Sequence, residues 1–268
     1  MTLFQSFILG IIQGLTEFIP VSSTAHLLIT QQILGISAND AVFSFLILVQ
    51  WGTLVSLFIY FREDILNLVK AFLAKPFSSE ENSLAWYIIT ATIPALLVGY
   101  LLKDILEKLF TTPLLAASIR LFSAAILLSL AEWLGKRKRT LDTITKQDAL
   151  IIGIFQVFAV FPGASRSGST IAGGMLRAFT RKSAARFAFL MSIPVMLAAG
   201  AYESLDLLKM PGLAEFIPTL LVGFITAALV GWLAIRWLMD YLNKNSLYSF
   251  AIYCAFLGTI VLSFHLFS

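Results

Sequence analysis

Two short polar stretches interrupt an otherwise apolar sequence and hold the side chains best suited to chemistry. Residues 14–28 read GLTEFIPVSSTAHLL and bring together a carboxylate, three hydroxyls and an imidazole: Glu17, Ser22, Ser23, Thr24 and His26. A histidine beside a serine can serve as general base for a nucleophile or as general acid for a leaving oxygen. A carboxylate here can bind a divalent cation, transfer protons or neutralise an arginine. Gln13, one helical turn earlier, can add an amide oxygen to the site or a hydrogen bond between helices.

The second stretch, VFPGASRSGST at residues 160–170, contains Arg166. A guanidinium at membrane depth needs a partner or a water-filled cavity, and its planar fork fits two oxygens of a phosphate. In both stretches proline ends one helix and serine or threonine starts another, so two helix N-termini can face a bound anion. We therefore expect a phosphate or diphosphate site between the breaks. An Arg166–Glu17 ion pair that only locks the two segments together is the structural alternative, and both roles are compatible.

The composition places this chain in a membrane. Hydrophobic residues make up 59% of the 268 residues and charged residues 13%, whereas soluble domains carry about 25% charged residues. The sequence predicts an all-α polytopic membrane protein, a single integral membrane domain over residues 1–268, with no nucleic-acid partner. Cys254 is the single cysteine, which excludes an intramolecular disulfide and a cysteine metal cluster. The N-terminal MTLFQSFILG lacks the basic start of a removable signal peptide.

Six apolar stretches are long enough, or nearly so, to cross the bilayer, which takes about 20 helical residues. They are residues 41–61, 84–102, 114–134, 187–202, 216–235 and 245–264. Residues 3–34 and 148–180 differ, because proline and polar residues divide each into halves too short to span. Short halves around an irregular tip are typical of a re-entrant pair or a broken helix. The predicted fold has six full transmembrane helices and two re-entrant helix pairs.

The positive charges predict an orientation. If the six spans alternate, fourteen Lys and Arg residues fall in loops on one side and three on the other. The positive-inside rule makes the richer side cytoplasmic. Both termini are then outside, the first re-entrant pair enters from outside, and the second enters from the cytoplasm. Within the spans, Arg120 is expected to reach outward towards Asp104 or Glu107, and Gln50 to hydrogen-bond a neighbouring helix.

The two broken segments resemble each other. GIIQGLTEFIPVSST at 10–24 aligns with GIFQVFAVFPGASR at 153–166 after one single-residue gap, and FSFL at 43–46 matches FAFL at 187–190. The unit at residues 10–65 therefore recurs at 153–208. Hydrophobicity alone would not match Gly, Gln, Pro and Ser. Entering from opposite faces, the two copies form an inverted-topology repeat, a fold that places its site near the bilayer midplane where the broken helices meet.

At the two breaks the sequence resembles the undecaprenyl-diphosphate phosphatase family, the bacitracin-resistance membrane phosphatases of bacteria. QGLTEFIPVSSTAH fits the family's stretch of Glu or Gln, a Glu four positions later and a trailing Ser-Ser-Thr-x-His. FPGASRSGSTIAGG fits its Pro-Gly-x-Ser-Arg-Ser-Gly-x-Thr motif, and the resemblance covers essentially the whole chain. It implies removal of the terminal phosphate of a C55 isoprenyl diphosphate in the bacterial inner membrane, at a site facing the outer side.

The resemblance implies a role for each matching residue. Glu17 would be an acidic catalytic or metal-binding residue, Ser23 the nucleophile with His26 as its base, and Arg166 the phosphate ligand; direct attack by water or by His26 stays open. Further phosphate contacts would come from Ser22, Thr24, Ser165, Ser167 and Thr170. The family is associated with Mg²⁺ or Ca²⁺, and Glu17 is the candidate ligand, supported by Gln13. One carboxylate plus the substrate's diphosphate could suffice for Mg²⁺, which keeps several waters.

Two other functions fit the same architecture. Inverted repeats, broken helices and a midplane anion site are typical of secondary transporters. A flippase for the phosphorylated lipid carrier would need no nucleophile. The density of Glu, Ser, His and Arg at the breaks favours chemistry. The expected partners are the bilayer and a long-chain isoprenyl diphosphate, and the sequence is compatible with a homodimer.

Overall fold

The computed structural model describes the whole chain except residues 38–39, 75–78, 103–112, 161–163, 208–212 and 268. The described chain is helical, and its extended backbone pairs at an isolated bridge between Arg139 and Phe179. The helices are α1 (Leu3–Phe18), α2 (Ser23–Ile33), α3 (Asp40–Tyr60), α4 (Arg62–Phe72), α5 (Glu80–Leu101), α7 (Pro113–Leu134), η1 (Leu141–Thr143), α8 (Lys146–Val160), α9 (Arg166–Leu176), α10 (Arg181–Leu207), α11 (Leu213–Tyr241) and α12 (Tyr248–Phe267).

The first predicted break is confirmed as an interruption between α1 and α2. α1 ends at Phe18, and Ile19 adopts extended backbone because the residue before a proline disfavours helical geometry. Ser22 then takes a left-handed φ of 69°, which is rare for a residue with a side chain. Its hydroxyl makes no cap hydrogen bond to α2. The turn therefore holds a strained serine whose hydroxyl is not used by the helix it precedes.

The second break lies between α8 and α9. Ser165 caps α9 in the predicted way, since its Oγ accepts a hydrogen bond from the backbone N–H of Gly168 at 3.2 Å. Pro162, the predicted helix breaker, is outside the described residues. The two breaks thus share a helix–break–helix plan but differ in how the serine at the start of the second helix is used.

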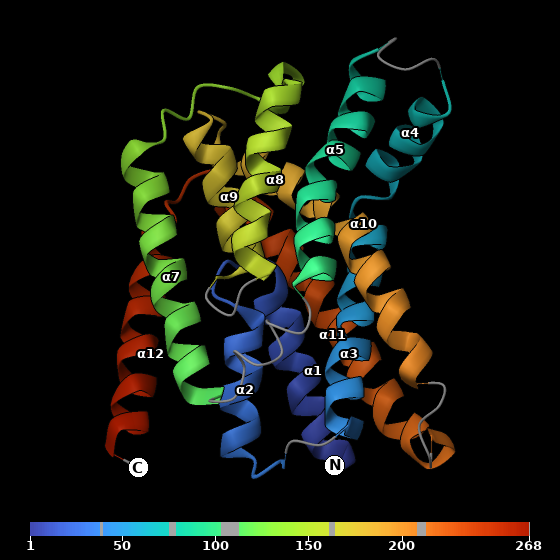
Figure 1. Ribbon diagram of the computed structural model, residues 1–268, viewed down its shortest axis with the longest axis vertical. Helices are drawn as coiled ribbons and strands as arrows, with labels where there is room; N and C mark the ends of the chain where they lie inside the picture. The colour runs from blue at the N-terminus through green and yellow to red at the C-terminus, as the bar shows by residue number, and fades with distance from the viewer. Residues whose placement is uncertain (38–39, 75–78, 103–112, 161–163, 208–212, 268) are drawn as a thin grey trace.

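The two broken segments approach each other from opposite ends of the molecule. Figure 1 shows α1 and α2 in the half that holds both chain termini, and α8 and α9 in the other half, with the breaks meeting between them. The long helices α3, α5, α7, α10, α11 and α12 surround this meeting point. Each of the six apolar stretches identified in the sequence lies largely within one of these helices.

Four of the long helices are apolar and long enough to cross a membrane by length and composition: α5, α7, α11 and α12. A fifth candidate is α3 together with α4, although a bend of 82° separates them. α4 was not predicted from the sequence, where its residues were expected to lie in a loop. The described residues therefore form a multi-pass helical bundle suited to a membrane environment.

α1 is held tightly against α11 by small residues. A Cβ atom on Gly10 would lie 2.7 Å from the backbone oxygen of Gly223, and one on Gly14 would lie 2.8 Å from Cβ of Val230. Side chains at these positions would push the helices apart, so glycine allows the backbones to touch, as small residues do at helix interfaces in membranes. This contact fixes the helix that carries Glu17.

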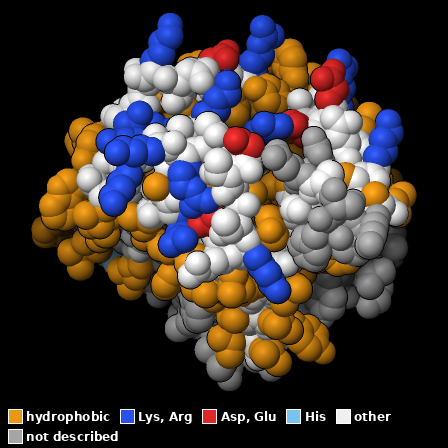
Figure 2. All heavy atoms as spheres, turned by 90° about the horizontal axis from the view of Figure 1, so that it is seen from above, with side chains coloured by type: hydrophobic (Ala, Val, Ile, Leu, Met, Phe, Trp, Pro, Cys, Tyr) orange, Lys and Arg blue, Asp and Glu red, His pale blue; other side chains and the backbone are white. Residues whose placement is uncertain are grey.

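The end of the molecule opposite the termini is basic. Figure 2 shows Lys and Arg side chains gathered on this face. Two buried carboxylates, Glu132 and Asp148, form ion pairs with arginines at this end. Glu132 is bound by Arg137, by Arg181 and by the backbone N–H of Leu247. The three lysines assigned to the opposite side, Lys103, Lys108 and Lys209, lie outside the described residues.

The second carboxylate, Asp148, lies in the first turn of α8. Its oxygens accept hydrogen bonds from Arg139 Nη2 at 2.7 Å, from Arg177 Nε at 2.7 Å and from Thr145. Burial opposes ionisation, but the two guanidinium groups and the Thr145 contacts outweigh it and lower the pKa of Asp148 to about 2. The carboxylate therefore joins the start of α8 to the end of α9.

Candidate active site

A cavity of about 180 Å³ lies where the two breaks meet. Its lining from α1, α2 and the turn between them is Glu17, Ser22, Ser23 and Thr24. The lining from α8, α9 and the second break is Ala159, Ala164, Ser165, Arg166 and Ser167, while α3 and α7 add Gln50 and Arg120. Residues from both breaks therefore line one cavity, at the place where the sequence predicts a shared site.

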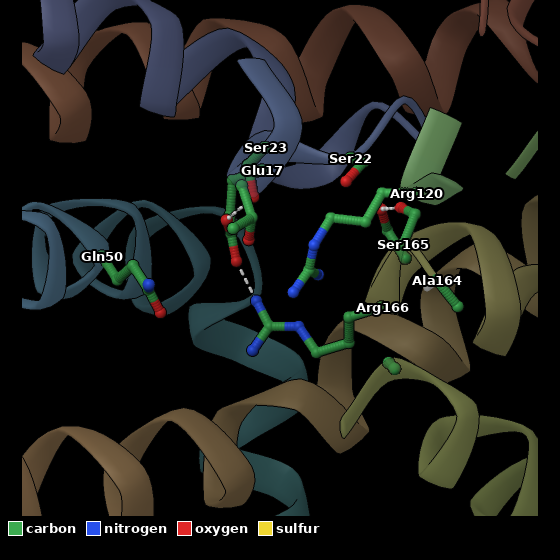
Figure 3. Close-up of a pocket in the computed structure, with 11 residues that line it drawn as sticks. Glu17, Ser22, Ser23, Gln50, Arg120, Ala164, Ser165 and Arg166 are labelled. Carbon is green, nitrogen blue, oxygen red and sulfur yellow. Dashed lines mark hydrogen bonds and ion pairs between the residues drawn. The ribbon is translucent and has the colours of Figure 1, made fainter. Parts of the chain in front are cut away.

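Glu17 is the centre of the hydrogen-bond network in the cavity. Its carboxylate forms an ion pair with Arg166, which comes from the other broken segment (Figure 3). The same carboxylate accepts hydrogen bonds from Ser23 Oγ at 2.8 Å and from Gln13 Nε2 at 2.8 Å. Because its side chain is 4% exposed, these partners replace the water it would otherwise need. The predicted locking pair therefore exists and shares its carboxylate with a serine.

The other predicted phosphate contacts divide into two groups. Ser22, Thr24, Ser165 and Ser167 line the cavity, and the hydroxyls of Ser165 and Ser167 lie 3.3 Å apart. Thr170 does not line it. Its hydroxyl donates to the backbone carbonyl of Arg166 at 2.8 Å, a bond within α9. In this structure the hydroxyl of Thr170 is engaged in the first turn of α9.

His26 is not placed as the base of Ser23. Its Nδ1 is 2.9 Å from the carbonyl oxygen of Ser22, and its Nε2 is 2.8 Å from the hydroxyl of Tyr253 on α12. The two rings stack at 5.7 Å between centroids. The Ser23 hydroxyl donates to Glu17 instead. The predicted Ser23–His26 pair is therefore corrected for this structure, because α2 turns the imidazole away from the cavity and towards α12.

Sequence reasoning missed two residues of the lining. Arg120 was expected to reach outward to Asp104 or Glu107, which lie outside the described residues, but its side chain points into the cavity (Figure 3). Gln50 also lines the cavity instead of serving only as a helix contact. Both are polar residues in apolar spans, which was the available signal. Sequence cannot give the rotation of a helix that is apolar on all sides, so the direction of these side chains was not predictable.

The residues beside Glu17 suit a hard cation. The Oε1 atom of Gln13 is buried and has no hydrogen-bond partner, although its amide nitrogen donates to Glu17. Carboxylate and amide oxygens are ligands that Mg²⁺ and Ca²⁺ accept. The described residues contain no group of three or more His, Cys, Asp or Glu side chains that could hold a metal ion. Any metal here would rely on these two side chains, water and substrate oxygens.

Such an arrangement is suited to phosphoryl transfer. It offers a serine hydroxyl with a carboxylate acceptor, guanidinium groups for phosphate oxygens, and the N-terminus of α2 for anionic charge. A family model described as bacitracin resistance protein BacA matches residues 6–260 of this chain. The chain belongs to the BacA family. The region that matches the family model contains all the residues that line the cavity.

Full-length relatives of this BacA chain are called undecaprenyl-diphosphatase. The protein of Anaeromyxobacter dehalogenans (strain 2CP-1) is 40% identical over 260 residues, which cover 94% of this chain and 88% of the relative. That of Caldicellulosiruptor bescii is 41% identical over 266 residues, covering 99% and 98%. That of Chloroherpeton thalassium is 39% identical over 276 residues, covering 98% and 96%. The similarity thus includes both broken segments and the helices around them.

Proposed function

We propose that this chain is an undecaprenyl-diphosphate phosphatase. It hydrolyses the terminal phosphate of a C55 isoprenyl diphosphate and so regenerates the monophosphate carrier for cell-wall synthesis. BacA family membership and relatives named undecaprenyl-diphosphatase support this function. The family description also links the chain to bacitracin resistance. The substrate is a lipid, in keeping with a site enclosed by apolar helices.

The hydrogen bond from Ser23 Oγ to Glu17 is the observation that carries the mechanism. Ser23 Oγ attacks the terminal phosphorus and its proton passes to the Glu17 carboxylate. The bond from that phosphorus to the bridging oxygen breaks, and the lipid monophosphate leaves with the electron pair. Water then attacks the phosphoserine, the P–Oγ bond breaks, Ser23 Oγ regains its proton from Glu17, and inorganic phosphate leaves. Arg166 holds the phosphoryl oxygens, and its move from Glu17 to substrate frees the carboxylate to accept the proton.

We assign Gln13 and Glu17 as the protein ligands of a divalent cation, Mg²⁺ or Ca²⁺. The unpartnered amide oxygen of Gln13 supports this assignment. When bound, the cation neutralises phosphate charge. His26 braces the site: its ring bonds to the carbonyl of Ser22, the residue with left-handed backbone, and Tyr253 holds the ring in place. Ser22, Thr24, Ser165 and Ser167 supply hydroxyls to the phosphates.

We further propose six transmembrane helices and two re-entrant pairs, with repeat units at residues 10–65 and 153–208. Matching packing supports the repeat: Gly10 of α1 lies against α11, and the matching Gly153 of α8 lies against Ala91 of α5. The basic face in Figure 2 supports a cytoplasmic location for that end. The termini and the first break then belong to the outer side of the bacterial inner membrane, from which the substrate enters.

The test is phosphate release from a long-chain isoprenyl diphosphate by the purified protein in detergent. Wild type should turn over with Mg²⁺ or Ca²⁺, and Arg166→Ala should lower kcat by on the order of 10³-fold, because a phosphate ligand that stabilises the transition state is lost. Arg62→Ala is the matched control, since that side chain is 73% exposed. It should retain wild-type turnover.

The same assay separates the rival functions. A secondary transporter or a flippase needs a sealed membrane with two sides and releases no phosphate in detergent. Absence of phosphate release in detergent, together with lipid movement in vesicles, would reject the phosphatase and support transport. Trapping phosphorus on Ser23 after acid quenching would separate serine attack from direct attack by water.

A further inference from the structure

Arg120 is a second guanidinium in the cavity and comes from a separate part of the fold. It belongs to α7, which lies outside both broken segments. The residue is 5% exposed, and Figure 3 shows its side chain extending into the cavity near Arg166 and Glu17. A guanidinium enclosed within a transmembrane helix bundle is costly unless it serves a partner or a ligand. Neither of the two sequence motifs includes it.

The charges of the lining show what Arg120 adds. Among the described residues of the cavity lining, the charged side chains are Glu17, Arg120 and Arg166. Glu17 and Arg166 form an ion pair, so their charges offset each other. Arg120 adds a second guanidinium to this lining beside that pair. A diphosphate ester carries more than one negative charge, and attraction to a fixed cation is stronger in low-dielectric surroundings than in water.

We propose that Arg120 binds the phosphate that stays on the lipid, while Arg166 binds the phosphate that is removed. The inference rests on the phosphatase function proposed above. Because Ser23 attacks the terminal phosphorus, the terminal phosphate lies at the Glu17–Arg166 side of the cavity. Arg120 enters the same cavity from α7 and contacts the inner phosphate, whose oxygen is the leaving group. A fixed cation there stabilises the negative charge that develops on this oxygen as the P–O bond breaks.

The two products report on the two subsites separately. Inorganic phosphate resembles the group held by Arg166, and an isoprenyl monophosphate resembles the group held by Arg120. Each product competes with substrate for its own subsite. Loss of one arginine should therefore weaken inhibition by one product far more than by the other. A merely structural role for Arg120 would weaken both products alike or neither.

The experiment measures competitive inhibition of the purified full-length protein in detergent, with farnesyl diphosphate as substrate. Farnesyl monophosphate and inorganic phosphate are the two inhibitors. Arg120→Gln should weaken inhibition by farnesyl monophosphate about 10-fold to 100-fold, the range for a charge-assisted hydrogen bond. Inhibition by inorganic phosphate should change less than about threefold, as for a separate site. Arg120→Lys, which keeps the charge, should recover part of the loss.

The matched control is Ser118→Ala, also in α7. Ser118 is buried and its hydroxyl bonds to the carbonyl of Leu115 in the same helix, so both inhibition constants should stay at the wild-type value. Inhibition constants do not depend on the fraction of folded protein. Equal weakening of both products by Arg120→Gln, or weakening confined to inorganic phosphate, would overturn the proposal.

A variant without turnover is assessed by binding. Equilibrium dialysis of Arg120→Gln with labelled farnesyl monophosphate and labelled inorganic phosphate gives the same comparison, and loss of both ligands or of neither overturns the proposal. Failure of the wild type to hydrolyse any isoprenyl diphosphate refutes the proposed function instead. That result is visible before any variant is compared.

Discussion

The two broken segments use matching positions for different chemistry. Ser23 of the first break aligns with Ser165 of the second, and at the same offset Thr24 aligns with Arg166 and Glu17 with Ala159. All six line one cavity. The first segment contributes the carboxylate and the hydroxyl bonded to it. The second contributes the guanidinium, while its serine caps α9. In the proposed mechanism, one helix–break–helix plan thus supplies the nucleophile from one segment and phosphate binding from the other.

The difference lies in what each serine hydroxyl does for its own helix. Ser165 satisfies a backbone N–H of α9, so it stabilises a helix start. At the first break Ser22 makes no such bond and Ser23 donates to Glu17. The hydroxyls of α2 are therefore released from capping, and the N–H groups at the start of α2 remain for an anion. At the first break, loss of the cap thus accompanies a serine hydroxyl that is bonded to a carboxylate.

The largest expected difference in kcat is between the variants Ser23→Ala and Ser165→Ala. Ser23→Ala should lower kcat by about 10³-fold or more, because the nucleophile is removed. Ser165→Ala should lower it by about 10-fold or less, since it costs a helix cap and one hydroxyl contact. Phosphate release and acid-quench trapping measure both. Similar losses in the two variants would mean that the breaks are chemically equivalent and would reject the assignment of Ser23.

A second contrast uses the aligned glutamines Gln13 and Gln156. Gln13→Glu adds a carboxylate beside Glu17, so the Mg²⁺ concentration for half-maximal activity should fall by about 10-fold. Gln156 is 1% exposed and both its polar side-chain atoms lack partners. Gln156→Glu should therefore reduce thermal stability, because a buried charge is added without a partner. A Mg²⁺ titration and a melting curve measure the two effects. A fall in Mg²⁺ requirement in Gln156→Glu would move the metal site to the second segment.

The brace of the first break is tested at Tyr253. Tyr253→Phe removes the hydroxyl that bonds to His26 Nε2, so the imidazole loses one of its two anchors and kcat should fall about 3-fold to 10-fold. The pH–rate profile should keep its shape, since a positioning ring contributes no titration of its own. Tyr248→Phe, an exposed position at the start of α12, is the control. A shifted basic or acidic limb in Tyr253→Phe would instead make His26 the base.

The smallest expected effect is on the stability of the second broken segment, where Asp148 joins the start of α8 to the end of α9. Asp148→Asn weakens the bonds to Arg139 and Arg177. The free energy of unfolding should therefore fall by about 1–3 kcal/mol. This is less than for a fully buried ion pair, because both arginines are about one-third exposed. Melting in detergent measures this change, and the exposed Asp142→Asn is the control. An unchanged melting temperature would mean that the second segment is not braced by Asp148.

The same carboxylate predicts a pH dependence. The folded pKa of Asp148, about 2, is below its ordinary value of 3.8. Its stabilising contribution is therefore complete above the unfolded value and is lost as pH falls through the folded one. We expect the melting temperatures of wild type and Asp148→Asn to differ at pH 5 and to become equal only as the pH falls towards 2. Convergence already near pH 5 would contradict the lowered pKa.

Much of the site was predictable from sequence because its signals are local. Proline and serine at residues 20–23 predict a helix break whatever the neighbours are. Polar residues within apolar segments mark the site, since they are costly in lipid. The direction of Arg120 and the partners of His26 were not predictable, because both depend on how one helix is rotated against another. α7 is apolar on several sides and α2 mixes polar and apolar residues, so hydrophobicity does not select one rotation for either helix.

The sequence by itself determined the class and the chemistry of this protein. Its composition requires a membrane, its two breaks require irregular backbone, and its motifs carry the resemblance to a phosphatase family. The tertiary structure decided which groups meet. Packing of α1 on α11 and of α8 on α5 brings Glu17 and Arg166 together although they are far apart in sequence. It also turns His26 to Tyr253 and Arg120 to the cavity, because side-chain direction follows from helix packing and not from residue type.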